Sequence, residues 1–496
     1  MLTFFKYFIT FFTAVILLIY YFFFTSMGEK SLCHFATTTL SKKSNLKLDV
    51  TSIDISHYPQ VNMVILVEKK AKLTLSGSID TNELDMDYTL TSNCIATELC
   101  TIDDLIDIKG HIKGLFTKLH IDGKGTALEG KVNYTAIKYS DKVENLHIDM
   151  EDINSSKLFK LMGETAYITG KANAQAHFYF MNEKHKNGYF IYNVKDKNFK
   201  GIPLTLSSKI NIHDDKHTFV IDISSDMMTL ELSKGQYNQI DKVADASYVL
   251  DIKNFNALEN ILGYKPQGSF YARGKIHYDQ TLNITGLSKS FEGLTNFTFK
   301  HNELSIKLDN VLIEKITQLF PFTQILTANT TGNIIYNTLK DTLHVKTKLK
   351  NAKFTHTKLV DVIRKKSGAK MLKETFDNAS LNFTYEDNTI LGDLKLANPH
   401  SHIYLTNTTI DTKLNTINAY FDFNMQKKVF SGKVYGRLDD PKVNLNMQKL
   451  IRYQMDKQVD KMIGKDGREI MEKMPMGDVA KDMATDMGAS FMKVFF

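Results

Sequence analysis

Apolar and polar residues alternate along most of the chain after residue 28. In one such run, Leu84, Met86 and Tyr88 alternate with Asp85 and Asp87. The same period of two recurs in other runs, whose apolar members are Leu146, Ile148 and Met150; Phe219, Ile221 and Ile223; Met228, Leu230 and Leu232; Leu304, Ile306 and Leu308; and Ile417, Ala419, Phe421, Phe423 and Met425. Successive side chains of a strand point to opposite faces, so this period predicts half-buried strands. Because the continuous apolar runs of a buried parallel sheet are not the pattern, we predict a mainly β fold with an antiparallel sheet and a few short helices.

A loose repeat accompanies this alternation. A glycine followed four residues later by a tyrosine bounds the segments 130–134, 274–278 and 332–336, and looser copies begin at Gly170 and Gly432. Short stretches with helical spacing precede three of these glycines, at 158–162, 258–262 and 316–320. Glycine inside a strand pattern is typical of a bend or a bulge. We therefore predict a degenerate repeat of helix, strand, glycine and strand that is built on hairpins.

The longest apolar run lies at the start of the sequence. No charged side chain occurs between Tyr7 and Thr25, and a helix of this length crosses a hydrocarbon layer of roughly 30 Å. Residues 20–25 do not offer the small residues of a signal-peptide cleavage site. We therefore predict an uncleaved transmembrane anchor at 1–28, with a short cytoplasmic end and a translocated body.

Two later regions depart from the strand period. Between Lys353 and Lys373, basic residues interleave with apolar ones, which predicts a basic amphipathic helix or a solvated helix face. After Asn446, apolar residues recur at spacings of three and four with lysines around them, which predicts an amphipathic helical tail at 447–496. This tail suits the membrane interface, the groove of a partner protein, or a helix that covers the end of the sheet.

Composition and charge narrow the class of protein. Of the 496 residues, 43% are hydrophobic and 24% are charged, which is typical of a folded chain that mostly faces water. The formal net charge of +7 is small for this length. It does not indicate a nucleic-acid partner, although local basic clusters can meet anionic lipid.

The sequence offers no positive sign of catalysis. It contains no phosphate-binding GxxxxGK[ST] motif, no zinc-binding HExxH motif and no GxSxG nucleophile motif. The 15 histidines are scattered, and each is expected to be a surface side chain. We therefore predict that the protein is not an enzyme, with no catalytic residue, no cofactor and no metal site.

Three cysteines, Cys33, Cys94 and Cys100, are present. Cys94 and Cys100 are close enough in sequence to bridge two strands in an oxidising compartment, which would leave Cys33 over. Three ordinary thiols are the alternative, and the sequence does not decide between the two. The spacing matches no zinc ligand set.

Residues 431–445, Ser-Gly-Lys-Val-Tyr-Gly-Arg-Leu-Asp-Asp-Pro-Lys-Val-Asn-Leu, resemble a known family signature. The stretch is similar to the carboxy-terminal signature of the AsmA-like proteins of Gram-negative envelopes, which include the TamB and YhdP types. Residues 376–407 are similar to the terminal sheet of that family. The short helical stretches that precede glycine-bearing strands at 158–170 and 316–332 also resemble it.

This resemblance implies a protein anchored in the inner membrane by a single helix, with the bulk of the chain in the periplasm. It implies an elongated, curled β-sheet groove that binds phospholipid acyl chains and supports phospholipid transport to, and integrity of, the outer membrane. The tail would then contact the outer membrane or an envelope protein. Candidate groove residues are Leu84, Met86, Leu146, Ile148, Leu230, Leu304, Ile306 and Phe421.

An alternative function uses the same anchor and sheet. In that case the protein is a structural or regulatory envelope protein that influences outer-membrane protein assembly through protein partners, and its groove is closed by its own helices. Under either function we expect four regions. They are the anchor at 1–28, a repetitive β-groove region at 29–350, an AsmA-like carboxy-terminal β region at 351–446 and the amphipathic tail at 447–496.

Overall fold

The computed structural model describes residues 33, 37–38 and 48–446, the last range with short gaps. The gaps are 55–58, 68–70, 97–100, 162–164, 166–168, 200–201, 260–263, 320–323, 358–359, 362–363, 366–368 and 427. The predicted anchor at 1–28 and the predicted tail at 447–496 lie outside the described residues. Within the described ranges, no helix has the length and apolarity needed to cross a membrane.

The fold is mainly β, which confirms the prediction from the period of two. The described residues form one long antiparallel sheet of 26 strands, with few helices. The chain divides into two compact units. Unit 1 comprises Met1–Asp251 and His277–Gln280, and unit 2 comprises Ile252–Ile276 and Thr281–Phe496.

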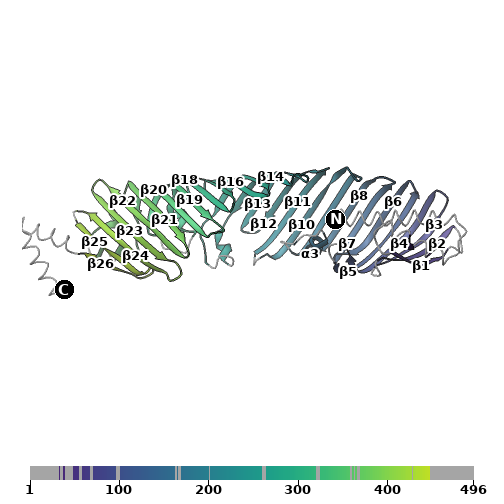
Figure 1. Ribbon diagram of the computed structural model, residues 1–496, viewed down its shortest axis with the longest axis horizontal. Coiled ribbons are helices and arrows are strands. Elements are labelled where there is room, and N and C mark those ends of the chain that lie inside the picture. The colour runs from purple at the N-terminus through teal and green to yellow at the C-terminus, as the bar shows by residue number, and fades with distance from the viewer. Residues whose placement is uncertain are drawn as a thin grey trace, which may run out of the picture. The chain divides into compact units, whose positions relative to one another are not determined.

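Unit 1 contains strands β1 to β13 and nearly all of β14. Their bounds are β1 Leu48–Asp54, β2 Gln60–Val67, β3 Ala71–Ile79, β4 Glu83–Ala96, β5 Thr101–Leu115, β6 Lys118–Ala127, β7 Gly130–Tyr139, β8 Val143–Asn154, β9 Lys171–Met181, β10 Lys186–Phe199, β11 Ile202–His213, β12 Lys216–Ser224, β13 Met228–Asn238 and β14 Val243–Ile252. From β1 to β13, each strand pairs antiparallel with the next one in sequence (Figure 1). Helix α3, Ser155–Leu161, follows β8.

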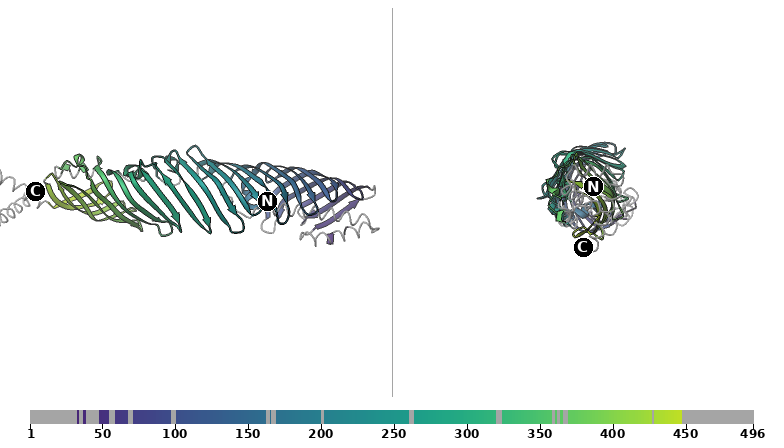
Figure 2. Two further views of the ribbon diagram at one scale, coloured as in Figure 1. Left: turned by 90° about the horizontal axis from the view of Figure 1, so that it is seen from above. Right: turned by 90° about the vertical axis from the view of Figure 1, so that its left-hand side faces the viewer.

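Unit 2 contains most of β15 and strands β16 to β26. Their bounds are β15 Phe270–Asp279, β16 Thr281–Ser288, β17 Leu294–Lys300, β18 Glu303–Leu312, β19 Leu326–Asn337, β20 Thr342–Phe354, β21 Asn378–Glu386, β22 Thr389–Asn398, β23 Ser401–Asp411, β24 Thr416–Met425, β25 Lys428–Arg437 and β26 Pro441–Asn446. From β16 to β26, each strand again pairs antiparallel with the next, as the teal-to-yellow strands of Figure 2 show. Its helical elements include the 3₁₀ turns η1, Phe255–Leu258, and η2, Met371–Lys373, and helix α5, Ile313–Thr317.

The short helical stretches that the sequence predicts fall at or next to short helical elements. Residues 158–161 lie in α3 and residues 316–317 lie in α5, while residue 258 ends η1. The region between Lys353 and Lys373 is more mixed than the predicted basic helix. It begins as the end of β20, is helical at residues 360–361 and 364–365, and ends in η2.

Tight hairpins join many of the strands. His301 and Asn302, between β17 and β18, have φ angles of 49° and 62°, and Asp387 and Asn388, between β21 and β22, have φ angles of 47° and 61°. Two successive residues with positive φ are typical of the type I′ turn, whose twist matches that of the flanking strands. Asn and Asp adopt this conformation at lower cost than other residues with a side chain. Asparagine at these positions therefore favours the tight turns that join neighbouring antiparallel strands.

Several bulges of unit 2 carry asparagine. Register shifts interrupt the ladders near Asn310, Asn351 and Asn407, which all have positive φ. Gly332 pairs with Leu308 and with Thr347, and the register shift between Leu308 and Val311 begins at its pair with Leu308. A short amide side chain tolerates positive φ, so Asn310 takes the extra position of this bulge opposite the strand of Gly332. The prediction of a bend or a bulge at the repeat glycines themselves stays a prediction.

Each unit has its own buried core on the apolar side of its strands. In unit 1, the buried cluster runs through β1 to β10 and includes Leu73, Ile112, Leu146 and Leu158 of α3. In unit 2, the main buried cluster combines strand residues with residues that follow β20. The latter are Val360, Ala369, Met371 and Phe376. The connection between β20 and β21 therefore covers part of the apolar side of unit 2.

Helix α3 is fixed to the sheet by a buried ion pair. The side chain of Asn154 accepts hydrogen bonds from the backbone N–H groups of Ser156 and Lys157, at 3.0 and 3.3 Å, which caps the helix. The Lys157 ammonium lies 3.0 Å from Asp104 Oδ1 and 3.0 Å from Glu129 Oε1. Only 2% of the Asp104 side chain is exposed, and its other oxygen accepts a hydrogen bond from the backbone of Leu128. Lys157 therefore compensates the charge of a carboxylate that is almost entirely buried.

Removing this lysine is expected to destabilise unit 1. Lys157→Met leaves the Asp104 carboxylate buried without its cation, which costs about 1–3 kcal/mol. Lys171→Met is the matched control, because the Lys171 side chain is 56% exposed, its ammonium lies 4.0 Å from Glu129 Oε2, and its hydrogen bond to the Glu129 carbonyl at 3.2 Å is exposed to water; it is expected to cost less than about 0.5 kcal/mol. Urea unfolding followed by circular dichroism checks both values, and equal losses in the two variants contradict the account.

Candidate functional site

An apolar row that is only half-buried crosses the central strands of unit 1. On β12, Phe219, Ile221 and Ile223 are half-buried, whereas the intervening Val220 and Asp222 are exposed. The neighbouring strands place further apolar residues opposite them. We call the set the unit 1 row: Ile210, Phe219, Ile221, Ile223, Leu230 and Leu232.

Unit 2 has a corresponding row on β16 to β19. Phe297 pairs with Ile306, which pairs in turn with Ile334. One step along the strands, Phe299 pairs with Leu304. All members of the set are half-buried, and we call them the unit 2 row: Ile284, Phe297, Phe299, Leu304, Ile306, Ile334 and Tyr336.

The eight candidate groove residues divide into two groups by burial. Five are buried, which are Leu84, Met86 and Leu146 at 1% exposure, Ile148 at 3% and Phe421 at 5%. The other three, Leu230, Leu304 and Ile306, are half-buried members of the two rows. Within the described residues, the apolar side is thus accessible on β11–β13 and β16–β19 and covered on most other strands. Whether any of the eight contacts a ligand stays a prediction.

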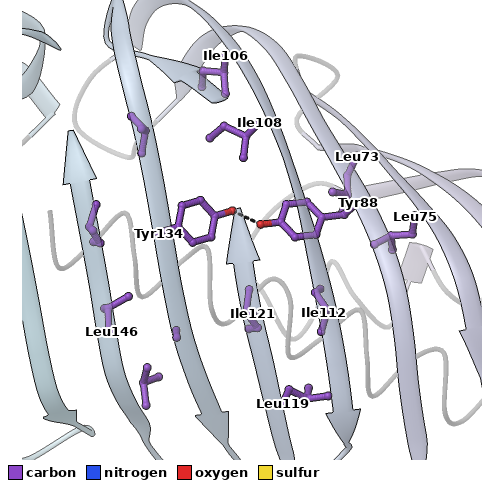
Figure 3. Close-up of a cluster of buried hydrophobic side chains, with 14 of the residues drawn as sticks. Leu73, Leu75, Tyr88, Ile106, Ile108, Ile112, Leu119, Ile121, Tyr134 and Leu146 are labelled. Carbon is purple, nitrogen blue, oxygen red and sulfur yellow. Dashed lines mark hydrogen bonds between the residues drawn. The ribbon is translucent and has the colours of Figure 1, made fainter. Parts of the chain in front are cut away.

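A tyrosine pair that the sequence did not single out as a site lies on the apolar side of unit 1 (Figure 3). The Tyr88 hydroxyl donates a hydrogen bond to the carbonyl of Asp122 at 2.8 Å, and the Tyr134 hydroxyl contacts that of Tyr88. Between the two tyrosines, Gly110 and Gly123 occupy the adjacent strands in the same cross-strand line. A Cβ on Gly123 would lie 2.3 Å from the Tyr88 hydroxyl oxygen. The two rings therefore take the space that side chains on these strands would fill.

Rings over glycines recur elsewhere on the apolar side. Phe219 covers Gly235 in unit 1, and Phe421 covers Gly432 in unit 2; the ring carbon nearest to an added Cβ would lie 2.4 Å away at Gly235 and 2.6 Å away at Gly432. In both cases the ring and its glycine are direct partners on neighbouring strands. Gly432 is one of the repeat glycines of the sequence, whereas Gly235 is not, and in both cases the partner ring is fixed only by strand register.

Several hydroxyl groups on the apolar side are buried without a hydrogen-bond partner among the described residues. They include Tyr248 Oη in unit 1 and Thr295 Oγ1 and Thr330 Oγ1 in unit 2. Burial raises the pKa of Tyr248 to about 12. Buried polar groups in proteins are usually paired with protein, water or a ligand. These hydroxyls therefore remain unpaired among the residues that the structure describes.

The polar side of the strands carries paired charges rather than a reactive cluster. His111 lies 2.8 Å from Asp87, His277 lies 2.8 Å from Asp245 and His402 lies 2.9 Å from Asp422. Across the described part of the chain, no three His, Cys, Asp or Glu residues are arranged to hold a metal ion. An open hollow of about 470 Å³ beside α3 is lined by Asn93, Asp104, Leu105, Thr126, Glu129 and Lys157, and its charges are those of the α3 ion pair. The Cys94 side chain and Cys100 lie outside the described residues, so the predicted disulfide stays a prediction.

Comparisons of the chain with protein-family models, curated proteins and solved structures find no match. The resemblance to the AsmA-like proteins therefore stays a prediction from the sequence.

The tyrosine pair is expected to make stability depend on alkaline pH. Burial raises the pKa values of Tyr88 and Tyr134, so above about pH 10 the unfolded chain releases protons that the folded chain keeps. Stability is then fully present below pH 10 and falls above it, by about 1.4 kcal/mol per pH unit for each tyrosine. In the double variant Tyr88→Phe/Tyr134→Phe, this part of the slope disappears. Urea unfolding between pH 8 and 11 measures the slopes, and identical slopes in the two proteins contradict the burial of the pair.

Proposed function

We propose that this chain is an inner-membrane-anchored periplasmic protein that binds phospholipid acyl chains along the apolar sides of its two units. In this proposal, the sheet provides a curled groove, the segment at 1–28 is the anchor, and the protein supports phospholipid transport to, and integrity of, the outer membrane. The supporting observations are the half-buried apolar rows and the resemblance of residues 431–445 to the AsmA-like signature.

The single observation that carries the proposal is the incomplete burial of the two rows. A folded protein is stabilised when apolar surface is removed from water. A large apolar surface that stays exposed therefore usually marks an interaction site. The rows consist of Ile, Leu, Phe and one Tyr, with no charged residue among them. An acyl chain gains about 0.8 kcal/mol for each CH₂ group that it buries. Lipid chains therefore match the chemistry of these rows.

The alternative, a structural protein that acts through protein partners, needs an apolar side that the chain covers itself. The burial of the apolar side on β1–β10, and its cover by the β20–β21 connection in unit 2, fit that requirement locally. The half-buried rows do not fit it. Lipid occupancy of the rows distinguishes the two functions.

The proposal predicts that phospholipid copurifies with the protein and depends on the rows. The variant Ile221→Asp/Ile306→Asp places one carboxylate in each row and should lose most of the bound phospholipid, because a charge in contact with acyl chains is costly. Mass spectrometry of lipids that copurify with the full chain in detergent measures the effect.

The matched control is Thr218→Asp/Asn333→Asp, which adds the same charge to exposed positions on the polar sides of the same units. It should keep the lipid of the wild-type protein. Circular dichroism confirms the fold of both variants. A second variant, Ile221→Trp/Ile306→Trp, keeps the rows apolar but fills space, and it should also lose lipid. Equal lipid in all four proteins, or none in the wild-type protein, overturns the proposal and favours the alternative.

A further inference from the structure

The polar side of β20 carries a line of lysines. Lys346, Lys348 and Lys350 are all exposed, and they alternate with residues that face the apolar side. Lys348 pairs with Ser380, which pairs with Lys395. The two lysines are therefore two strands apart, at roughly 10 Å between their backbones.

Further lysines continue this surface toward β26. Lys433 and Lys442 lie on the same side of β25 and β26, next to Tyr420 and Tyr435. We call the set the basic face of unit 2: Lys346, Lys348, Lys350, Lys395, Lys433 and Lys442. Within the described residues, none of the six forms an ion pair with an acidic side chain.

Acidic residues on the polar side of these strands are few, and each has a partner other than the six lysines. Away from the hairpin turns, they are Asp393 and Asp422 among the described residues of β20 to β26. Asp393 accepts a hydrogen bond from the backbone of Asn407 at 3.1 Å, and Asp422 lies 2.9 Å from His402. On the polar side of unit 1, by contrast, several charges pair, as Lys113 does with Asp85 at 2.7 Å. The basic face therefore keeps an uncompensated positive charge.

Exposed apolar and aromatic side chains lie among these lysines. Leu391 is 52% exposed, Tyr420 is 51% exposed and Tyr435 is 41% exposed. The Lys433 ammonium lies 5.4 Å from the centre of the Tyr420 ring. Tyrosine is favoured where one end of the side chain is apolar and the other is wet, as at a membrane surface. Lysine beside exposed apolar groups is the composition of a surface that binds anionic lipid bilayers.

We propose that the basic face of unit 2 docks on the headgroups of an anionic bilayer. This contact is separate from acyl-chain binding on the apolar side, because it uses the opposite side of the same strands. The lysines supply attraction to phosphate groups, and Leu391, Tyr420 and Tyr435 enter the interfacial layer. A nucleic acid would also attract the lysines, but it offers nothing to an exposed leucine.

The experiment uses the full chain reconstituted in nanodiscs of neutral phosphatidylcholine. Fluorescent vesicles of phosphatidylcholine, with or without phosphatidylglycerol, are added, and flotation measures how many vesicles are captured. The wild-type protein should capture anionic vesicles and leave neutral ones free, and raised salt should release them. The variant Lys346→Glu/Lys348→Glu/Lys350→Glu should capture at least about tenfold fewer anionic vesicles than the wild-type protein.

The matched control is Lys109→Glu/Lys124→Glu/Lys131→Glu. These three lysines are exposed on the polar side of unit 1, so the net charge changes by the same amount while the basic face stays intact. The control should capture anionic vesicles as the wild-type protein does. Equal capture by all three proteins assigns the contact to another part of the chain and overturns the proposal. Capture of neutral vesicles, or binding to heparin without binding to anionic vesicles, overturns it as well.

Discussion

The structure depends on one constraint. Each strand in which apolar and polar residues alternate has one apolar side, and that side must be removed from water. In a sheet of 26 strands, this requirement repeats along most of the described chain. Helices α3 and α5 and the β20–β21 connection supply part of the cover. On β11–β13 and β16–β19 the cover is incomplete. The proposed function follows from this shortfall, because a ligand with acyl chains would cover the apolar surface that the protein leaves open.

The same constraint explains the details of the apolar side. Tyr88 and Tyr134 bring two hydroxyl groups into a buried layer, and they satisfy them through each other and the Asp122 carbonyl. Glycines beneath the rings make room for them. Tyr248, Thr295 and Thr330 lack such a partner. Buried polar groups are usually paired, so the Tyr88–Tyr134 pair avoids a cost that these three hydroxyls carry.

Much of the fold was predictable from the sequence, because alternation is a local signal. The runs at 84–90, 146–150 and 219–223 all lie in antiparallel strands. Burial was less predictable. Leu84 and Leu304 belong to similar patterns, yet the first is buried and the second is half-buried. The difference depends on which distant segments cover each strand, and a local period does not contain that information. The tyrosine pair and the basic face were missed for the same reason, since both are assembled by strand register.

The central claim, that acyl chains lie on the apolar side, has a direct spectroscopic test. The chain contains no tryptophan, so Phe219→Trp and Val220→Trp each introduce one fluorophore. The two positions are adjacent on β12, but Phe219 belongs to the unit 1 row and Val220 is 43% exposed on the polar side. Phospholipids with brominated acyl chains quench tryptophan only at short range. When they are added in small molar excess to the full chain in detergent, the account predicts quenching at position 219 and little at position 220. Equal quenching at both positions, or none at position 219, would contradict it.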